Sequence, residues 1–380
     1  MTDRRASTLR DRTRDELFEL IRTNPSMTRS RLSELTGVPR STVNHAVGRL
    51  IATGVVVEVQ TVSGKASGRP GVGLAAAPGR GVVAGIDFGH GHVAVAVADT
   101  LGTVLGEERQ TIDVDLDAQA AIAYAVDALE RLAADAMEPV SFVVAGVPGP
   151  VDDRTGTVRS PTILSGWVGL VPAQELERRL GVTVEVANDA VLGAYGERQL
   201  GAGRGVRDFL YVKASGGIGA SLMLGGSIYT GASGLAGEIG HTEIAGHTEP
   251  CRCGKRGCLE AVVAVEPLRD RIAHAHRSND AAAVDLGDLN DPITTRIMNE
   301  AGRILGYPLA GICNLLNPAA VIVGGVLGTT CPAFVEGVEA SIRRHALPAM
   351  SEEISVLPAA LGQRAEILGA VQMAAHRFAR

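Results

Sequence analysis

Three cysteines and two histidines crowd into one short stretch of the chain. Cys251, Cys253 and Cys258 lie within eight residues, and His241 and His247 precede them. Glycines beside the cysteines allow the backbone angles of a tight turn. Zn²⁺ favours four tetrahedral ligands from Cys and His, and a closed set of four is a structural site rather than a catalytic one. The cluster therefore predicts structural zinc in preference to a redox pair, although spacing alone leaves either histidine as the fourth ligand.

The sequence carries no sign of secretion or of a membrane span. No run of about 18 apolar residues could cross a bilayer, and the first residues hold several arginines in place of an apolar signal segment. Clustered thiols in such a chain favour a metal site in a reducing compartment. We therefore expect a cytoplasmic protein in which Cys313 and Cys331, set among apolar residues, are inert core residues.

A second candidate for chemistry is the dipeptide Asn188-Asp189, which follows an apolar strand pattern and precedes a helical one. An aspartate at a strand end that faces a cleft can act as a general base toward a hydroxyl group. Asn and Asp are also the residues that cap helix N-termini. From the dipeptide alone, capping is the simpler interpretation.

Charge is divided unevenly along the chain. Residues 1–80 hold 13 basic and 7 acidic residues, which leaves 23 basic and 35 acidic residues in the other 300. A basic segment ahead of an acidic body suggests that the N-terminal part meets a polyanion while the body has another task.

The basic segment has the spacing of three short helices. An apolar face runs along residues 15–23. Thr28 is expected to cap a second helix that ends at Gly37, since a hydroxyl can accept from the first backbone N–H groups and glycine adopts left-handed angles. A third helix is expected to begin at Ser41 or Thr42. Two helices joined by a short turn are typical of the DNA-binding helix-turn-helix.

The sequence predicts a β-wing that consists of a strand over 55–59, a loop over 63–71 and a return near Leu74. The unit is therefore interpreted as a winged helix. Arg and Asn can make paired hydrogen bonds to base edges, hydroxyls suit phosphates, and an arginine on the wing can enter a minor groove. The alternative is a winged helix that contacts only proteins. The predicted DNA-contacting residues are Arg40, Ser41, Thr42, Asn44, His45, Arg49 and Arg69.

From about residue 82 the pattern is α/β. A strand hairpin followed by a strand–helix unit occurs twice, which suggests two similar lobes with a cleft between them. Strands are expected at 82–87, 92–99, 104–111, 140–146, 182–186, 209–212, 218–224 and 321–324, and helices at 118–137, 173–180, around Leu305 and Leu309, and at 363–378.

The stretch from Gly240 to Glu260 resembles the signature of the ROK family of repressors, uncharacterised reading frames and sugar kinases, with Thr248 departing from it. The resemblance implies His241, not His247, as the fourth zinc ligand. It also implies a ribonuclease-H-like, actin-like body behind the winged helix. The domains would be the winged helix at 1–80, lobe 1 at 81–195 with the C-terminal helix at 363–380, and lobe 2 with the zinc knuckle at 196–362.

The resemblance further implies a pocket for a monosaccharide or a sugar phosphate. Carboxylates, an amide and an imidazole suit a ring of sugar hydroxyls, which donate and accept at once. The zinc would support this pocket without acting as a Lewis acid. The implied sugar-binding residues are Asn188, Asp189, Glu238, His241 and Glu260, with the backbone of Gly149 close to the sugar.

Kinases of the family hold ATP phosphates in two turns, Asp-x-Gly-Gly-Thr and Gly-Thr-Gly-Ile-Gly. Here the turns read Asp-Phe-Gly-His-Gly from Asp87 and Ser-Gly-Gly-Ile-Gly from Ser215, so both threonines are missing. Phosphoryl transfer depends on positioning and electrostatics, and the chain is therefore expected not to be an enzyme. Asp189 would be the base if it were one.

The sequence thus predicts a sugar-responsive, DNA-binding transcriptional regulator of carbohydrate metabolism, and a repressor in particular. Its expected partners are a double-stranded DNA operator, a sugar effector and further copies of itself in a homodimer or homotetramer. The alternative function is an ATP-dependent sugar kinase with an accessory DNA-binding domain.

Overall fold

The computed structural model describes residues 9–60, 72–77, 79–152, 156–158, 164–288 and 290–378. The predicted wing loop, with Lys65 and Arg69, lies outside the described residues. Among the helices that are described, none is both long and apolar enough to cross a membrane.

The N-terminal unit is a three-helix cluster with a two-stranded hairpin, as the sequence predicts. Its elements are α1 (Leu9–Thr23), α2 (Arg29–Thr36), α3 (Arg40–Ala52), β1 (Val56–Gln60) and β2 (Val72–Ala76). The two strands pair antiparallel. A separate core holds the unit together, because Leu17, Ile21, Leu32, Val47 and Leu74 are fully buried.

The predicted start and end of α2 are both confirmed, whereas the predicted start of the third helix is wrong by one or two residues. The Thr28 hydroxyl accepts from the backbone N–H of Arg31, and Gly37 has left-handed angles. The third helix begins at Arg40, not at Ser41 or Thr42, because Pro39 rather than a hydroxyl residue stands at its N-cap. Proline fixes a φ angle that suits a helix start, so no side-chain cap is needed there.

The body contains two five-stranded sheets with the same strand pattern. The first has the order β5-β4-β3-β6-β7 and the second β10-β9-β8-β11-β12. In each, three strands pair antiparallel and two further strands extend the sheet in parallel. The strands are β3 (Val82–Gly89), β4 (His92–Asp99), β5 (Val104–Thr111), β6 (Val140–Val147), β7 (Val184–Asn188), β8 (Phe209–Ala214), β9 (Ile218–Leu224), β10 (Ser227–Tyr229), β11 (Ala320–Gly324) and β12 (Ser355–Pro358).

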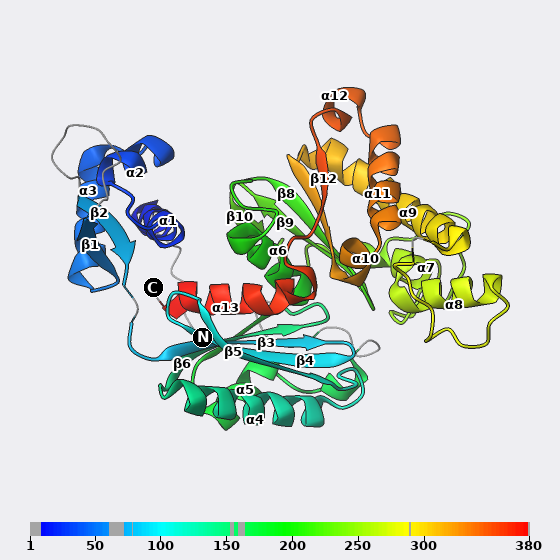
Figure 1. The fold of residues 1–380 in the computed structure, drawn as a ribbon, viewed down its shortest axis with the longest axis horizontal. Coiled ribbons are helices and arrows are strands. Elements are labelled where there is room, and N and C mark those ends of the chain that lie inside the picture. Colours follow the sequence, from blue (N-terminus) through cyan, green and yellow to red (C-terminus); the bar gives the residue numbers. More distant parts are fainter. Residues whose placement is uncertain are drawn as a thin grey trace.

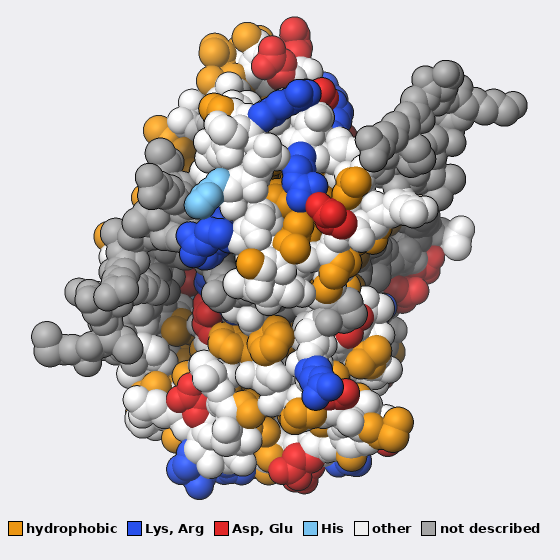
Figure 2. Space-filling view, turned by 90° about the vertical axis from the view of Figure 1, so that its left-hand side faces the viewer, with side chains coloured by type: hydrophobic (Ala, Val, Ile, Leu, Met, Phe, Trp, Pro, Cys, Tyr) orange, Lys and Arg blue, Asp and Glu red, His pale blue; other side chains and the backbone are white. Residues whose placement is uncertain are grey.

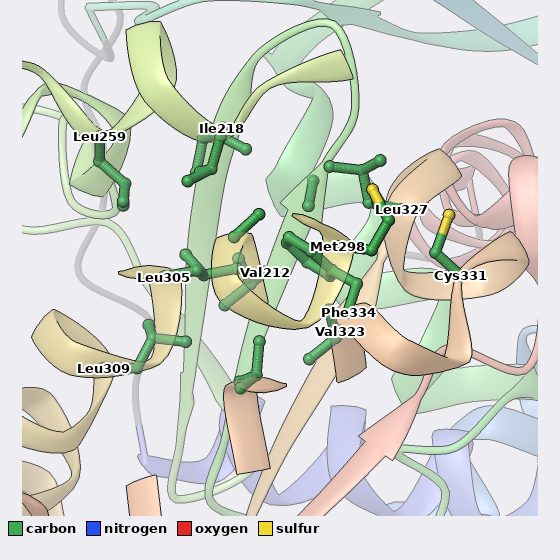
Figure 3. Packing of buried hydrophobic residues seen from close by; sticks show 14 of the residues in the cluster. Val212, Ile218, Leu259, Met298, Leu305, Leu309, Val323, Leu327, Cys331 and Phe334 are labelled. Atoms are coloured by element: carbon green, nitrogen blue, oxygen red, sulfur yellow. The ribbon is translucent and has the colours of Figure 1, made fainter. Parts of the chain in front are cut away.

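Helices cover both faces of each sheet (Figure 1). On the first sheet, α4 (Ala118–Ala136) and α5 (Pro172–Leu180) lie on one face, and α13 (Ala365–Phe378) lies on the other. On the second sheet, α9 (Pro292–Leu316) and α11 (Pro332–His345) pack over residues such as Val212 and Val323 (Figure 3).

The remaining elements are short. They are η1 (Ser165–Trp167), η2 (Ile239–His241), α7 (Leu259–Val263), α8 (Val265–Ala275), α10 (Gly325–Thr330), α12 (Pro348–Ser351) and η3 (Gly362–Arg364). Sequence patterns did not predict β10, β12, α8 or α11. The edge strands β10 and β12 have only three and four residues, too few for a period-two pattern to be recognised.

One helix crossing joins the two sheets. Helix α6 (Asp189–Leu200) contributes Leu192 to the core under the first sheet and Ala194 to the core under the second. It crosses α13 at Gly196 and Gly369, and a Cβ atom at Gly369 would lie 1.8 Å from the backbone oxygen of Leu192. The two helices can approach this closely only because neither residue has a side chain.

The close helix crossing predicts that one added methyl group lowers the stability of the protein strongly. We expect Gly369→Ala to lower the free energy of unfolding by about 1–3 kcal/mol, the usual cost of overpacking a dense core. Gly311→Ala is the matched control, because nothing lies within 4 Å of a Cβ atom there and alanine favours the helix by up to about 1 kcal/mol. Urea denaturation checks both, and equal midpoints for Gly369→Ala and the parent would contradict the crossing.

Candidate binding pocket, metal centre and nucleic-acid interface

The structure brings one histidine and three cysteines together at the end of η2. The donor atoms of His241, Cys251, Cys253 and Cys258 all lie within 4.8 Å of one another. The sulfur atoms of Cys253 and Cys258 are 3.7 Å apart, which is about the edge of a tetrahedron with Zn–S bonds of 2.3 Å. His247 is not in this group, and its ring contacts Glu249 at 3.2 Å. The donor set fits structural zinc.

Two glycines shape this knuckle. Gly254 has a φ of 91° and Gly257 a φ of 66°, and a Cβ atom at Gly257 would lie 2.4 Å from the backbone oxygen of His247. Left-handed angles of this kind favour glycine. The chain can therefore turn back twice within eight residues and present its thiols to one point.

A pocket opens between the two sheets, and side chains from both lobes line it. All the residues singled out for sugar binding are among the lining residues: Gly149, Asn188, Asp189, Glu238, His241 and Glu260. The Nδ1 atom of His241 is 3.6 Å from the sulfur of Cys251, whereas its Nε2 atom is 3.9 Å from Glu238. One imidazole thus serves the metal centre on one side and the pocket on the other.

Helix capping, one of the two roles that the dipeptide suggested, falls to Asn188, whereas Asp189 makes a different contact. The Asn188 side-chain oxygen accepts from Ala190 N–H at 2.9 Å, which makes Asn188 the N-cap of α6. Its amide nitrogen donates to the backbone oxygen of Gly149 at 3.1 Å. Asp189 is the first residue of the helix and turns one carboxylate oxygen toward Lys213.

Lys213 is the functional residue that sequence patterns did not reveal. Its ammonium group lies 2.8 Å from Asp189 and 3.7 Å from Glu366, and its side chain is 13 % exposed. Burial opposes its charge, but these two carboxylates hold the pKa of Lys213 above its ordinary value. Lys213 comes from β8 and Glu366 from α13, so only the tertiary fold brings them to Asp189.

The pKa values of two other carboxyl groups of the pocket are also shifted by their surroundings. Burial, with the charges of Asp189 and Glu260 next, raises the pKa of Glu238 to about 7. Burial likewise raises the pKa of Glu366 to about 7 against the pull of Lys213. Near neutral pH the pocket can therefore present a protonated carboxyl group as a hydrogen-bond donor as well as carboxylate acceptors.

Two histidines stand in or directly after the first phosphate-like turn. His92 contacts Asp87 at 2.9 Å, and burial of Asp87 is offset by this bond and by Lys213, so that the pKa of Asp87 stays below its ordinary value. The ring of His90 lies against the second turn, 3.1 Å from where a Cβ atom of Gly217 would be. The imidazole of His90 therefore occupies space between the two turns.

One ion pair spans the cleft beside these turns. Asp115, between β5 and α4, accepts from His90 at 2.7 Å and from Arg252 at 2.9 Å. Arg252 belongs to the metal knuckle and also donates to the backbone oxygen of Gly216. The metal centre is thus connected to both walls of the pocket.

The candidate DNA surface lies on α3. Its predicted contact residues Arg40, Ser41, Thr42, Asn44, His45 and Arg49 are all exposed, whereas Val43, Ala46, Val47 and Leu50 face the core. Figure 2 shows basic side chains and a histidine on the face that carries the winged helix. Arg69, the seventh predicted contact, lies outside the described residues.

Comparison with known proteins gives two family matches. Residues 83–377 match the ROK family, and residues 10–57 match a winged helix-turn-helix DNA-binding family. Among curated relatives, the xylose repressor of Bacillus spizizenii is 27% identical over 366 residues, which cover 95% of this chain and 94% of the relative.

Solved structures agree on the architecture. A ROK family transcriptional regulator, a homologue of the Escherichia coli Mlc protein, superposes with a TM-score of 0.77 over 96% of both chains, at 24% identity. A ROK family glucokinase from Streptomyces griseus, in complex with glucose and AMPPNP, has a TM-score of 0.69 and 26% identity over 77% of this chain and 99% of its own. The predicted fold, a winged helix-turn-helix before a two-lobed body, is confirmed.

The metal centre makes a direct prediction. We expect protein purified without chelator to hold about one Zn²⁺ per chain, and both Cys253→Ser and His241→Ala to lose it, because a structural site needs all four ligands. His247→Ala is the matched control and should keep the metal. Elemental analysis measures the content, and loss from His247→Ala without loss from His241→Ala would mean that the wrong histidine has been assigned.

Proposed function

The chain belongs to the ROK family, and we propose that within this family it is a sugar-responsive transcriptional regulator that binds an operator and acts as a repressor. One observation carries the proposal: similarity to a xylose repressor runs along 95% of the chain. It therefore covers the winged helix and the pocket together. The winged helix would bind the DNA, and the pocket would bind the effector.

The effector that the pocket suits is a monosaccharide or a sugar phosphate. Asn188 is fixed by its cap and by Gly149, and Glu260 accepts from the backbone N–H of Ile218 at 3.0 Å. Side chains held in this way are prepared for hydroxyl groups before the ligand arrives, which lowers the cost of binding. Zinc would hold His241 and the knuckle in place without touching the sugar.

Two contacts argue against phosphoryl transfer in this pocket. A general base must accept the proton of the attacking hydroxyl group, but one oxygen of Asp189 is engaged by the ammonium group of Lys213 at 2.8 Å. The imidazole of His90 stands between the turns where kinases of the family hold phosphates. We therefore propose that the pocket binds its sugar and does not phosphorylate it.

The second candidate function is an ATP-dependent sugar kinase with an accessory DNA-binding unit. Its support is Asp189 itself, which lines the pocket, together with the similarity of the body to a solved glucokinase. The two functions differ in a measurable product, since only a kinase converts ATP to ADP in the presence of sugar.

The proposed regulator acts as a homodimer or homotetramer in the cytoplasm. A pair of recognition helices related by two-fold symmetry matches a pseudo-palindromic operator, with half-sites about one or two helical turns apart. Exposed Arg and Asn side chains on α3 support this use of the helix. The proposed domain bounds are residues 1–80, residues 81–195 with 363–380, and residues 196–362.

Sugar binding should appear as a thermal shift. We expect one of D-xylose, D-glucose, N-acetylglucosamine or their phosphates to raise the melting temperature, because a ligand at 100 times its dissociation constant adds roughly 2.7 kcal/mol. Asp189→Asn should lose most of this shift, and Asp127→Asn, an exposed residue of α4, should keep it. An ATP-dependent phosphorylation that Asp189→Asn abolishes would replace the regulator with the kinase.

DNA binding should depend on the exposed side chains of α3. With genomic fragments selected by the parent protein, we expect Arg40→Ala or Asn44→Ala to weaken binding by about 1–3 kcal/mol, the usual worth of a paired base contact. Arg131→Ala, which removes an exposed arginine from α4, should bind as the parent does. Unchanged affinity in both α3 variants, measured by fluorescence anisotropy, would rule out α3 as the recognition helix.

A further inference from the structure

A buried arginine connects the winged helix to the body. The side chain of Arg22, in the last turn of α1, is only 6 % exposed. One guanidinium nitrogen donates to Gln372 on α13 at 2.6 Å and to the backbone oxygen of Leu101 at 3.2 Å. The other donates to Gln199 on α6 at 3.2 Å. A single side chain of the DNA-binding unit therefore touches both crossing helices.

A counter-charge makes this contact specific. Glu19, one turn earlier on α1, pairs with Arg22 at 2.8 Å and also with His376 on α13. A buried ion pair that loses one partner leaves an uncompensated charge, which is strongly destabilising. The end of α1 is thus held against α13 in one arrangement and does not rest loosely on it. Figure 1 shows α1 beside the C-terminal end of α13.

The same two helices begin in the pocket. Helix α6 starts at Asp189, and Glu366 lies in the first turn of α13, 3.7 Å from the Lys213 that pairs with Asp189. Gln199 lies ten residues after Asp189, and His376 ten residues after Glu366, so each helix spans about 15 Å between these residues at the rise of an α-helix. Each helix therefore has one end at the pocket and its other end at α1.

The two helices cannot shift independently. A Cβ atom at Gly196 would lie 2.4 Å from the backbone oxygen of Ala365, and one at Gly369 would meet Leu192. Packed interiors of this density respond to a local change by moving as units. A change at the pocket end of either helix is thus carried to its far end.

We propose that α6 and α13 transmit the occupancy of the pocket to the winged helix, with Lys213 as the sensor and Arg22 as the receiving contact. A sugar hydroxyl that binds Asp189 competes with Lys213 for this carboxylate, and Lys213 then turns toward Glu366 on α13. The resulting shift of the helix pair moves the partners of Arg22. This inference rests on the proposed function, because it concerns how that pocket regulates DNA binding.

The test compares the two ends of the helix pair in the full-length protein. Asp189→Asn keeps the size of the side chain but removes the charge that holds Lys213. Hydrogen–deuterium exchange followed by mass spectrometry then reports on the amides of residues 13–23. We expect the exchange rate of α1 to change by about 5-fold or more, the lower range of coupling between sites. In an Arg22→Met background, Asp189→Asn should leave the exchange of α1 unchanged.

Two controls separate transmission from general destabilisation. Arg377→Met removes an arginine next to His376 whose ion pair, with Glu185, stays within the body. In that background α1 should still respond to Asp189→Asn. Exchange in α4, on the opposite face of the first sheet, should be the same in all variants, and normalising to α4 removes any global loss of stability.

A second arm adds the sugar that gives the largest thermal shift, or D-xylose if none does. If the exchange rate of α1 changes neither with Asp189→Asn nor with a bound sugar, the proposed transmission is wrong, while the proposed function is unaffected. If the exchange rate of α1 changes with Asp189→Asn but no sugar binds, the proposed effector is wrong, while the mechanical connection is supported. A response that persists in the Arg22→Met background overturns the role of Arg22.

Discussion

The buried ammonium group of Lys213 is the interaction on which the centre of the molecule depends. Moving a charge out of water is costly unless opposite charges accompany it. Lys213 meets Asp189 and Glu366 within 4 Å, and Asp87 also acts on it. These carboxylates come from α6, α13 and β3. Neutralising one lysine thus requires three separate segments of the body to converge on one point.

This convergence is the physical basis for our proposal that a kinase-like body serves recognition without catalysis. The carboxylate that could accept a proton already contacts an ammonium group, and the imidazole of His90 lies between the turns that could hold phosphates. The pocket keeps the polar groups that sugar hydroxyls need. In the proposed regulator, binding energy that a kinase would direct toward a transition state would instead change the position of α6 and α13.

The metal centre and the helix crossing have different structural roles. The four-donor knuckle makes a short, glycine-rich loop rigid enough to hold His241 and Arg252 at the pocket. The crossing at Gly196 and Gly369 joins the two lobes through one helix pair. In the proposed regulator, metal ligation would position groups that contact the effector, and helix packing would connect those groups to the DNA-binding unit.

The sequence by itself determined the features that depend on neighbours along the chain. Local spacing and periodicity predicted the thiol cluster from Cys251 to Cys258, the cap at Thr28, the apolar runs of most strands and the exposed face of α3. The three thiols, in particular, lie within eight residues, whereas spacing alone left either His241 or His247 as the fourth donor.

Only the tertiary structure decided which distant charges meet. Lys213 sits in an apolar strand, Glu366 and Gln372 in an apolar helix, and Arg22 at the end of an amphipathic one, and the local pattern around each of them does not show which residue it meets. Their partners lie from 24 to 350 residues away. Such pairings are fixed by how sheets and helices pack, and no periodic signal in a single sequence identifies the distant partner of a charged residue.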